Sequence, residues 1–546
     1  MYIATAPNRT SPPAILLRES IREGKKVKTR TLANLTSWPD DRIRALKRCL
    51  KGEFDHLPSL STPTCDRGFG VLFVLKELAQ RVGLIQALGK APQAKLALFL
   101  VLARVAHQGS RLSAVRWAEE QAVAEVLGLA AFDEDALYGA LDWLAEQQAR
   151  LELALYRHYV KRVGQTPVLV LYDVPSSYFE GMDNELAAYG YNRDGTRGKK
   201  QIVIGLLTAA DGEPLAIRVF RGNTTDCTTV ATQIELLKQR FNINEVVFVG
   251  DRGMVKAKGK KALTDEGLQY ITALTDPQVR ALLKKQVFQP DLFDETAQAV
   301  EHGSLRLVLR RNDAMCRQQR QRRQDKLAQL QRLLEQRNAL VQASPRAQPE
   351  AGLRRFSAWI KRYKLNGFVT LSLQDRQLHL DIDEDKRAQV QLLDGCYVVE
   401  TDVAGDHMDA PTVDARYRDL QNVERDFRTL KTTRLELRPI FVRKANRTRA
   451  HVFCAMLALK LAREFDSGLK AAFGSTADDT RALTVTDALQ ALSRLCFQRY
   501  EAEGQSFLAL PQVDQKQAAI FNAVDIKPPP TQFSAEANMS AELFLR

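Results

Sequence analysis

Two aspartates each follow a short, strongly apolar run. Asp173 ends the run PVLVLYD, and Asp251 ends the run VVFVGD. A single aspartate after a strand is more often a turn or helix-cap residue than a catalytic one. Two of them, after the first and fourth apolar runs of one region, instead predict a carboxylate pair at the edge of a common sheet.

A third carboxylate is expected from the stretch APTVDARYRDLQNVERDFRTLK. Tyr417, Glu424 and Lys431 are spaced there at seven and seven residues. Two helical turns take about 7.2 residues, so one helix would place all three side chains on one face. A solvated helix face is the alternative explanation, and the aspartate pair favours the functional one.

Three converging carboxylates would repel one another unless they bound divalent cations. Ligation by oxygen alone favours Mg²⁺ or Mn²⁺ over zinc. Two such ions about 4 Å apart can activate a water or a 3′-hydroxyl and stabilise the leaving oxygen of a phosphodiester. The expected cofactor is therefore two Mg²⁺ (or Mn²⁺) ions, and the expected chemistry is phosphodiester hydrolysis or strand transfer.

Several cations close to the two aspartates are candidate contacts to DNA phosphates. Most lie in or after the loop NRDGTRG, for which a solvated hairpin tip is an equally good interpretation. The candidates are Arg193, Arg197, Lys199, Lys200 and Arg252.

The sequence around these residues predicts the strands and helices of an α/β fold. The short apolar runs TPVLVLYD, QIVIGLLT, PLAIRVF and NEVVFVGD are typical of strands, and TTVATQIELLKQRF, before the fourth, is typical of a helix. Three strands, a helix and another strand is the opening order of an RNase H-like sheet. LQYITAL would add a fifth strand, and Asp226 is expected to cap the helix.

The regions before this sheet have different patterns. Helical spacing runs from about residue 69 to 163, where a pair of segments fits either a helix-turn-helix reader or two packed helices. Upstream, ILLRESIREGKKVKTRTLANL predicts a β-hairpin with a basic second strand. That strand could meet phosphates or be a charged edge strand.

Residues 276–393 are expected to form an inserted domain, because strand-like pieces flank a highly basic helix. The helix carries an apolar stripe of Leu327, Leu330, Leu334 and Val341. A local helical hairpin is the commoner explanation of such a stripe, and a coiled-coil seam is the other. Trp359 could stack on a DNA base, although core packing is the commoner role of a tryptophan.

Composition narrows the class of partner. The 546 residues include 79 Lys and Arg against 65 Asp and Glu, a net charge of +14, which favours nucleic acid over membrane as the partner. The apolar run from Leu96 to Ala103 is too short to span a membrane, and no secretory signal is recognisable. A cytoplasmic protein is expected.

The cysteines predict neither a zinc site nor a disulfide framework. There are seven, scattered and never spaced as C-x-x-C. We expect reduced thiols.

Five motifs in order carry a resemblance to a known family: LYDVPSSYFEG, GYNRDG with GKKQIVIGLL, PLAIRVFRGNTTD, VVFVGDRGM and YRDLQNVERDFRTLK. From about Leu169 to Lys460 the chain resembles the Asp-Asp-Glu transposases of bacterial insertion sequences, in the branch called insertion sequence four. The resemblance implies that Asp173, Asp251 and Glu424 are the catalytic metal ligands.

The family signature Tyr-x2-Arg-x3-Glu-x6-Lys is matched with one departure. Tyr417, Glu424 and Lys431 match, and Leu420 stands at the position of the arginine. By resemblance that arginine contacts a DNA phosphate near the cut, so its role is left open here. Arg428 and Arg425 are the candidates to replace it.

The long stretch between Asp251 and Glu424 also matches the family, whose members carry a β-rich insertion there. By resemblance the insertion holds transposon-end DNA and shields a hairpin or flipped base. The expected fold is α/β, with an RNase H-like catalytic core (a mixed sheet flanked by helices), a β-containing insertion and a mainly helical N-terminal DNA-binding region.

The predicted regions follow the chain in six parts. They are a basic N-terminal hairpin region (1–60), a helical DNA-binding domain (61–163), the first part of the core (164–275), the insertion (276–393), the second part of the core with the Glu424 helix (394–470) and a C-terminal helical region with a flexible tail (471–546).

The expected function is that of a transposase bound, as a homodimer, to its terminal inverted repeats and to target DNA in a bacterial cytoplasm and nucleoid. Two alternatives remain. One is a DNA-binding protein that descends from a transposase and no longer cuts, and the other is an RNase H-like nuclease that cuts without joining.

Overall fold

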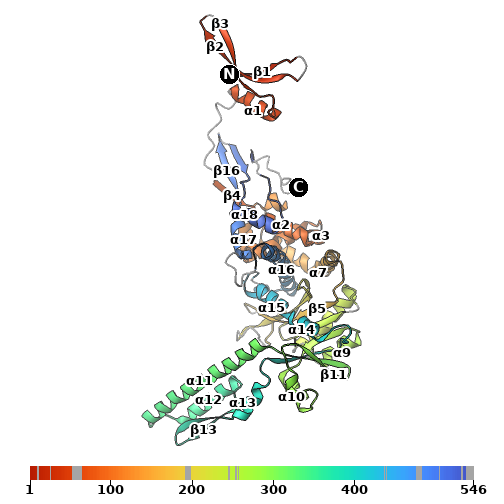
Figure 1. The fold of residues 1–546 in the computed structure, drawn as a ribbon, viewed down its shortest axis with the longest axis vertical. Coiled ribbons are helices and arrows are strands. Elements are labelled where there is room, and N and C mark those ends of the chain that lie inside the picture. Colours follow the sequence, from red (N-terminus) through yellow and green to blue (C-terminus); the bar gives the residue numbers. More distant parts are fainter. Residues whose placement is uncertain are drawn as a thin grey trace. The chain divides into compact units, whose positions relative to one another are not determined.

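The computed structural model describes most of the chain. Outside the description are residues 9–11, 25, 52–63, 182, 191–197, 244–245, 252–254, 256, 434, 436, 438–439, 475–481, 503–504, 531–532 and 536–546, and the side chains of residues 226, 227, 258, 432, 433, 501, 502, 505–507 and 533–535. The chain divides into two compact units, the first of residues 1–68, 495–513 and 528–546 and the second of residues 69–494 and 514–527 (Figure 1).

The first unit contains two antiparallel sheets. One has the order β1-β2-β3 and is accompanied by helix α1. Its elements are β1 (Tyr2–Ala6), β2 (Ala14–Glu23), β3 (Lys26–Asn34) and α1 (Asp40–Leu50). Strands β2 and β3 pair up to Glu23 opposite Lys26, so the predicted basic hairpin is present.

The other sheet of this unit joins segments from both ends of the chain, in the order β18-β17-β16-β4. The strands are β4 (Thr64–Gly68), β16 (Cys496–Ala502), β17 (Gln505–Ala509) and β18 (Phe533–Ala535). A disulfide bond joins Cys65 to Cys496 across β4 and β16. The expectation that all cysteines are reduced thiols is therefore wrong for this pair, because strand pairing brings together two residues 431 positions apart.

The second unit is built on a nine-stranded sheet whose centre has the order β8-β7-β5-β9-β10. Strands β5, β9 and β10 run parallel to one another, and β7 is antiparallel to both β5 and β8. The bounds are β5 (Leu169–Asp173), β6 (Ser176–Tyr178), β7 (Gln201–Ala209), β8 (Pro214–Arg221), β9 (Val247–Gly250) and β10 (Gln269–Ala273).

Helix α8 (Asp226–Glu235) and the π-helical turn η1 (Leu236–Arg240) connect β8 to β9, and α9 (Ala257–Asp265) connects β9 to β10. This order and direction of strands is the RNase H-like arrangement, so the predicted fold class is confirmed. Thr225, and not Asp226, occupies the N-cap position of α8, and the side chain of Asp226 lies outside the described residues.

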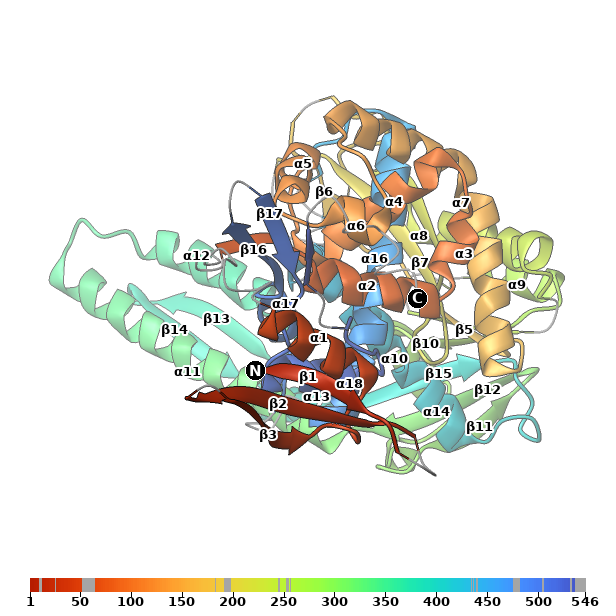
Figure 2. The same ribbon diagram turned by 90° about the horizontal axis from the view of Figure 1, so that it is seen from above.

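Apolar runs buried on both faces explain why these residues form central strands. All nine residues of β7 are buried, and Tyr172 of β5 lies with its ring centroid 5.6 Å from that of Phe248 in β9. Helices cover the sheet, among them α16 (Ala445–Phe473), which packs against α4 (Pro92–Ala106), α7 (Glu134–Val163) and β8 (Figure 2).

The predicted insertion has two structurally different parts. Its first strands, β11 (Gln298–His302) and β12 (Leu305–Arg311), extend the central sheet, because β12 pairs with β15 (Cys396–Thr401) and β15 pairs with β10. Helix α10 (Asp276–Lys284) and a short 3-10 turn, η2 (Pro290–Leu292), precede them.

The second part forms a small core of its own. It consists of α11 (Asp313–Ala343), α12 (Pro349–Arg362), β13 (Val369–Gln374), β14 (Gln377–Ile382) and α13 (Glu384–Gln391). Leu327, Leu330 and Leu334 of α11 pack there with residues of α12 and of the β13-β14 hairpin. These three leucines of the apolar stripe are thus buried against neighbouring elements of the insertion itself. This packing agrees with a local helical hairpin and not with a coiled-coil seam.

Helices dominate the region before β5 and recur near the end of the unit. They are α2 (Gly70–Arg81), α3 (Leu84–Leu88), α4 (Pro92–Ala106), α5 (Arg111–Glu119), α6 (Val123–Leu127), α7 (Glu134–Val163), α17 (Val485–Leu492) and α18 (Gln515–Ala523). Across the described residues, no helix combines the length and the apolar character needed to cross a membrane.

Candidate active site

The two predicted aspartates lie at the same edge of the central sheet. Strands β5 and β9 are parallel neighbours, with Tyr172 opposite Gly250. Asp173 and Asp251 are the next residues along the chain, so they follow at the same level at the carboxyl ends of the two strands. Asp173 is half-buried, and its Oδ1 accepts a hydrogen bond from the Val174 amide at 2.7 Å. Asp251 is exposed.

The predicted helix with the Tyr-Glu-Lys face is three consecutive helical segments. They are α14 (Ala410–Arg418), α15 (Leu420–Arg428) and the π-helical turn η3 (Thr429–Thr433). Helix α14 packs against β9, β10 and β15, whereas α15 packs against β5. The break at Asp419 lets the chain follow two different parts of the sheet, and this was not predicted.

Two residues of the signature lie next to the aspartates. The Tyr417 hydroxyl donates a hydrogen bond to Asp251 Oδ1 at 3.4 Å. The Lys431 ammonium donates to the carbonyl oxygen of Ser176, three residues after Asp173. Glu424, between them in sequence, is an exposed residue of α15.

Within the described ranges, no three His, Cys, Asp or Glu side chains form a group that could hold a metal ion. The donor type at the sheet edge is carboxylate oxygen, which is the ligand type that Mg²⁺ and Mn²⁺ prefer.

Leu420 cannot take the place of the signature arginine. Its side chain is 9% exposed and lies with Val423 and Phe427 on the buried face of α15. Arg425 and Arg428 are exposed on the same helix.

A buried ion pair anchors α15 to α16. Arg463 contacts Asp426 at 2.7 Å between Nη1 and Oδ1. Burial raises the pKa of Asp426, and the Arg463 guanidinium opposes that shift. This contact holds the helix that carries Glu424 against the core.

Asp414 is a residue that sequence reasoning missed. It is 1% exposed, and the Tyr397 hydroxyl, the Arg310 guanidinium and the Arg418 guanidinium all contact its carboxylate. The Tyr397 ring lies 6.3 Å from the ring of Tyr417. Asp414 therefore fixes the helix that presents Tyr417 to Asp251. Its partners come from three elements, so no local pattern marks it.

The structure describes some of the remaining residues that are predicted to contact DNA. Arg193, Arg197 and Arg252 lie outside the described residues. Lys199 forms an ion pair with Glu180, and Lys200 is half-buried.

Trp359 packs at the edge of the insertion's own core. Its ring centroid lies 4.4 Å from that of Tyr363. The ammonium of Lys326 and the guanidinium of Arg362 both lie over the Tyr363 ring.

Comparison with known proteins gives two family matches. Residues 168–461 match the model described as the transposase DDE domain, and residues 3–62 match the N-terminal domain of the IS1634 family of transposases. No curated protein matches the chain.

Two transposases are among the solved structures to which the chain is similar. A piggyBac transposase synaptic complex with hairpin DNA is 9% identical and covers 83% of this chain and 76% of that one, with a TM-score of 0.35. A Mos1 transposase paired-end complex with the left transposon end is 13% identical and covers 33% of this chain and 60% of that one, with a TM-score of 0.15. Because the DDE-domain match covers more than half of the 546 residues, the chain belongs to the DDE transposase family, in its insertion-sequence branch.

Proposed function

We propose that this transposase binds the terminal inverted repeats of its own insertion sequence, cleaves the ends by phosphodiester hydrolysis and joins the freed 3′-hydroxyls to target DNA. The observation that carries the proposal is the placement of Asp173 and Asp251 at the carboxyl ends of neighbouring parallel strands, with Tyr417 bonded to Asp251. A nuclease that works on a long duplex needs such a pair where the sheet meets solvent.

The proposed metal ligands are Asp173, Asp251 and Glu424. Two Mg²⁺ or Mn²⁺ ions bound there would activate the attacking hydroxyl and neutralise charge on the leaving oxygen. The all-carboxylate donor set fits hard cations, and the exposure of Asp251 and Glu424 fits entry of a large substrate.

The neighbouring residues would bind and orient the DNA. Tyr417 donates a hydrogen bond to one oxygen of Asp251, and Lys431 places a positive charge beside the segment that follows Asp173. Further proposed DNA contacts are Arg428, Arg252, Arg193, Arg197, Lys199, Lys200 and Trp359. We further propose that the chain acts as a homodimer on nucleoid DNA.

An end-cleavage and joining assay tests this function. The purified chain is mixed with a duplex that contains the end of the element encoding it, with EDTA or with MgCl₂. We expect cleavage at the element end only with the metal, and joining of pre-cut ends to a supercoiled plasmid.

Each other outcome identifies an alternative. Cleavage without joined product would identify a nuclease that lacks strand transfer, and binding without cleavage in Mg²⁺ or Mn²⁺ would identify a DNA-binding protein that no longer cuts. Inverted repeats on both sides of the gene would support the proposal independently.

A further inference from the structure

Two arginines and a tyrosine surround one buried carboxylate beside the sheet edge that carries the aspartates. The Arg310 guanidinium and the Tyr397 hydroxyl both donate to the carboxylate of Asp414, which is 1% exposed. The Nε of Arg418 lies 3.1 Å from Oδ2 of the same carboxylate. These four residues are called the Asp414 cluster below.

The pairing of the strands places the Asp414 cluster close to the aspartates. Asp173, Asp251 and Ala273 each follow directly after residues that pair with one another, so they stand at one level of β5, β9 and β10. Val399 of β15 pairs with Ala273, and Tyr397 lies two residues from Val399 on the same face of that strand.

Helix α14 reaches both places. Its Tyr417 donates to Asp251, and its Asp414 accepts from Tyr397. Strand β10 lies between β9 and β15, and two strand spacings amount to about 10 Å. One strand of B-DNA carries a phosphate about every 3.4 Å along the helix axis, so a cation of the Asp414 cluster would lie within about three nucleotides of a phosphate held at the aspartates.

The surroundings of Asp414 keep an excess of positive charge. Asp414 forms ion pairs with Arg310 and Arg418, and Arg416 forms one with Asp419. Burial raises the pKa of Asp419, and the charges of Arg416 and Arg418 oppose that shift. Three guanidinium groups thus face two carboxylates, which leaves one positive charge among these five side chains. The Arg418 side chain is 47% exposed, so this charge reaches solvent.

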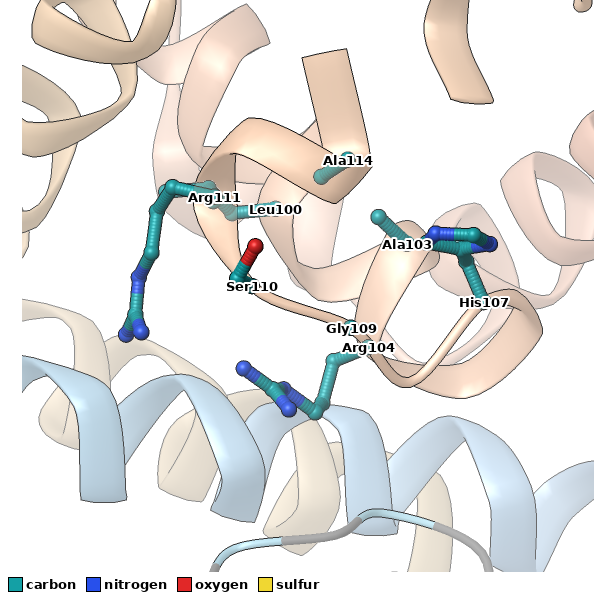
Figure 3. A pocket seen from close by; sticks show the side chains of 8 residues that line it. All are labelled: Leu100, Ala103, Arg104, His107, Gly109, Ser110, Arg111 and Ala114. Carbon is teal, nitrogen blue, oxygen red and sulfur yellow. The ribbon is translucent and has the colours of Figure 1, made fainter. Parts of the chain in front are cut away.

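Another pair of arginines is enclosed by helices instead. Arg104 and Arg111 line a cavity of about 20 Å³ where α4 turns into α5 (Figure 3). Arg111 is 9% exposed, and its Nη2 donates to Nδ1 of His451 in α16 at 2.7 Å. The Arg111 guanidinium therefore serves the packing of α5 against α16, whereas Arg418 is accessible to a large ligand.

We propose that Arg418 binds a backbone phosphate of the element's DNA within about three nucleotides of the phosphate that is cut. The inference rests on the proposed function, because it takes the ligand at the aspartates to be that DNA. A guanidinium whose Nε side is anchored on a buried carboxylate is already oriented before the phosphate arrives, and charge-assisted hydrogen bonds to phosphate are strong. The contact sets the position of the DNA and is independent of base sequence.

Salt-dependent binding tests the contact without any need for cleavage. Binding of the element-end duplex is measured in EDTA over a series of salt concentrations for the wild type, Arg418→Gln and Arg418→Lys. Arg416→Gln is the matched control, because Arg416 is an arginine of the same helix that pairs with Asp419 and not with Asp414. A second series uses duplexes with one neutral methylphosphonate linkage, placed at each position near the cut or a full helical turn away.

Loss of one phosphate contact lowers the magnitude of the slope of log K against log salt by about 0.9. We expect this change in Arg418→Gln, and the wild-type slope in Arg418→Lys and Arg416→Gln, because a lysine keeps the charge. One neutral linkage near the cut should weaken binding by the wild type and by Arg416→Gln but not by Arg418→Gln. The distant linkage should affect all four proteins equally.

Three results would overturn the proposal. They are a wild-type slope in Arg418→Gln, a loss in Arg418→Lys as large as that in Arg418→Gln, or a neutral-linkage profile near the cut that is the same in Arg418→Gln and the wild type. Thermal unfolding checks that each variant is folded, which the exposure of the Arg418 side chain favours.

The proposed function fails separately. If the wild type cleaves and joins ends while Arg418→Gln binds DNA as the wild type does, the phosphate contact is wrong and the function stands. A wild type that neither binds nor cleaves element ends refutes both.

Discussion

His451 shows how a single residue can make stability depend on pH. It is buried, and this burial, followed by the charges of Arg111 and Arg104, lowers its pKa well below the ordinary value of 6.5. In the unfolded chain the same imidazole takes up a proton near pH 6.5. The unfolded state therefore binds more protons below that pH, and the free energy of unfolding falls as the solution is acidified.

We predict that this fall begins near pH 6.5, with a slope that approaches about 1.4 kcal/mol per pH unit for His451. Urea unfolding between about pH 7.5 and pH 5.5 measures it. His107, whose pKa is also lowered, acts in the same direction, so the comparison is between the wild type and His451→Gln. If the free energy of unfolding changed equally with pH in the wild type and in His451→Gln, the pH dependence could not be attributed to His451.

The three proposed metal ligands make a second prediction at this scale. Asp173→Asn, Asp251→Asn and Glu424→Gln each remove a ligand charge with little change in volume. We expect cleavage to fall by more than about 100-fold, beyond the effect typical of outer-shell partners, with end binding nearly unchanged. The assay is end cleavage beside a binding titration.

Asp265→Asn is the control, since Asp265 is an exposed carboxylate at the end of α9, away from β5. Parallel loss of binding and cleavage would argue against a role in metal binding. If any one of the three variants cleaved DNA as well as the wild type, the residue changed in it would not be a metal ligand.

At the scale of elements, the long helix α7 is held to the central sheet by a buried charge cluster. Glu152 is fully buried, and its carboxylate contacts Arg218 of β8 at 2.7 Å and Arg240 of η1 at 2.8 Å. The Gln148 side chain donates to it as well. One carboxylate thus connects the helical region to two pieces of the RNase H-like core.

We predict that Glu152→Gln lowers the free energy of unfolding by about 3 kcal/mol, because two partly buried guanidinium groups lose their counter-charge. Urea unfolding measures the change. Glu146→Gln on the exposed face of the same helix is the control and should have an effect within about 0.5 kcal/mol. An equally small effect of Glu152→Gln would mean that the cluster adds no net stability.

At the scale of the whole molecule, the Cys65–Cys496 bond joins the two ends of the chain within the first unit. We predict that this unit loses about 2–4 kcal/mol of stability when the bond is absent. Thermal unfolding of the wild type with and without reductant, and of Cys65→Ser, measures the loss. Cys49→Ser, at an exposed free cysteine, should have no such effect.

Alkylation without reduction, followed by mass spectrometry, checks the bond directly. Under denaturing conditions Cys65 and Cys496 are expected to stay unmodified, whereas the four free cysteines among the described side chains, Cys49, Cys316, Cys396 and Cys454, are expected to be modified. Modification of all seven would show that the two sulfurs are thiols in the purified protein.

The sequence by itself determined the order of the central strands. Apolar runs bounded by turn residues specify β5, β7, β8, β9 and β10 locally, and the aspartates at 173 and 251 are marked by the ends of two of them. The helical region before β5 was predicted for the same reason, since periodicity within one segment needs no distant partner. The resemblance to insertion-sequence transposases rested on motifs of this local kind, and the family match agrees with it.

Only the tertiary structure decided which distant segments meet. The pairing of β15 with β10 and β12, the disulfide between β4 and β16, the contact of Asp414 with Arg310 and the hydrogen bond between Arg111 and His451 each join residues far apart in sequence. The break between α14 and α15 likewise follows the sheet strands beneath them. Such contacts depend on the packing of whole elements, and the hydrophobic periodicity of a single segment carries no information about its partner.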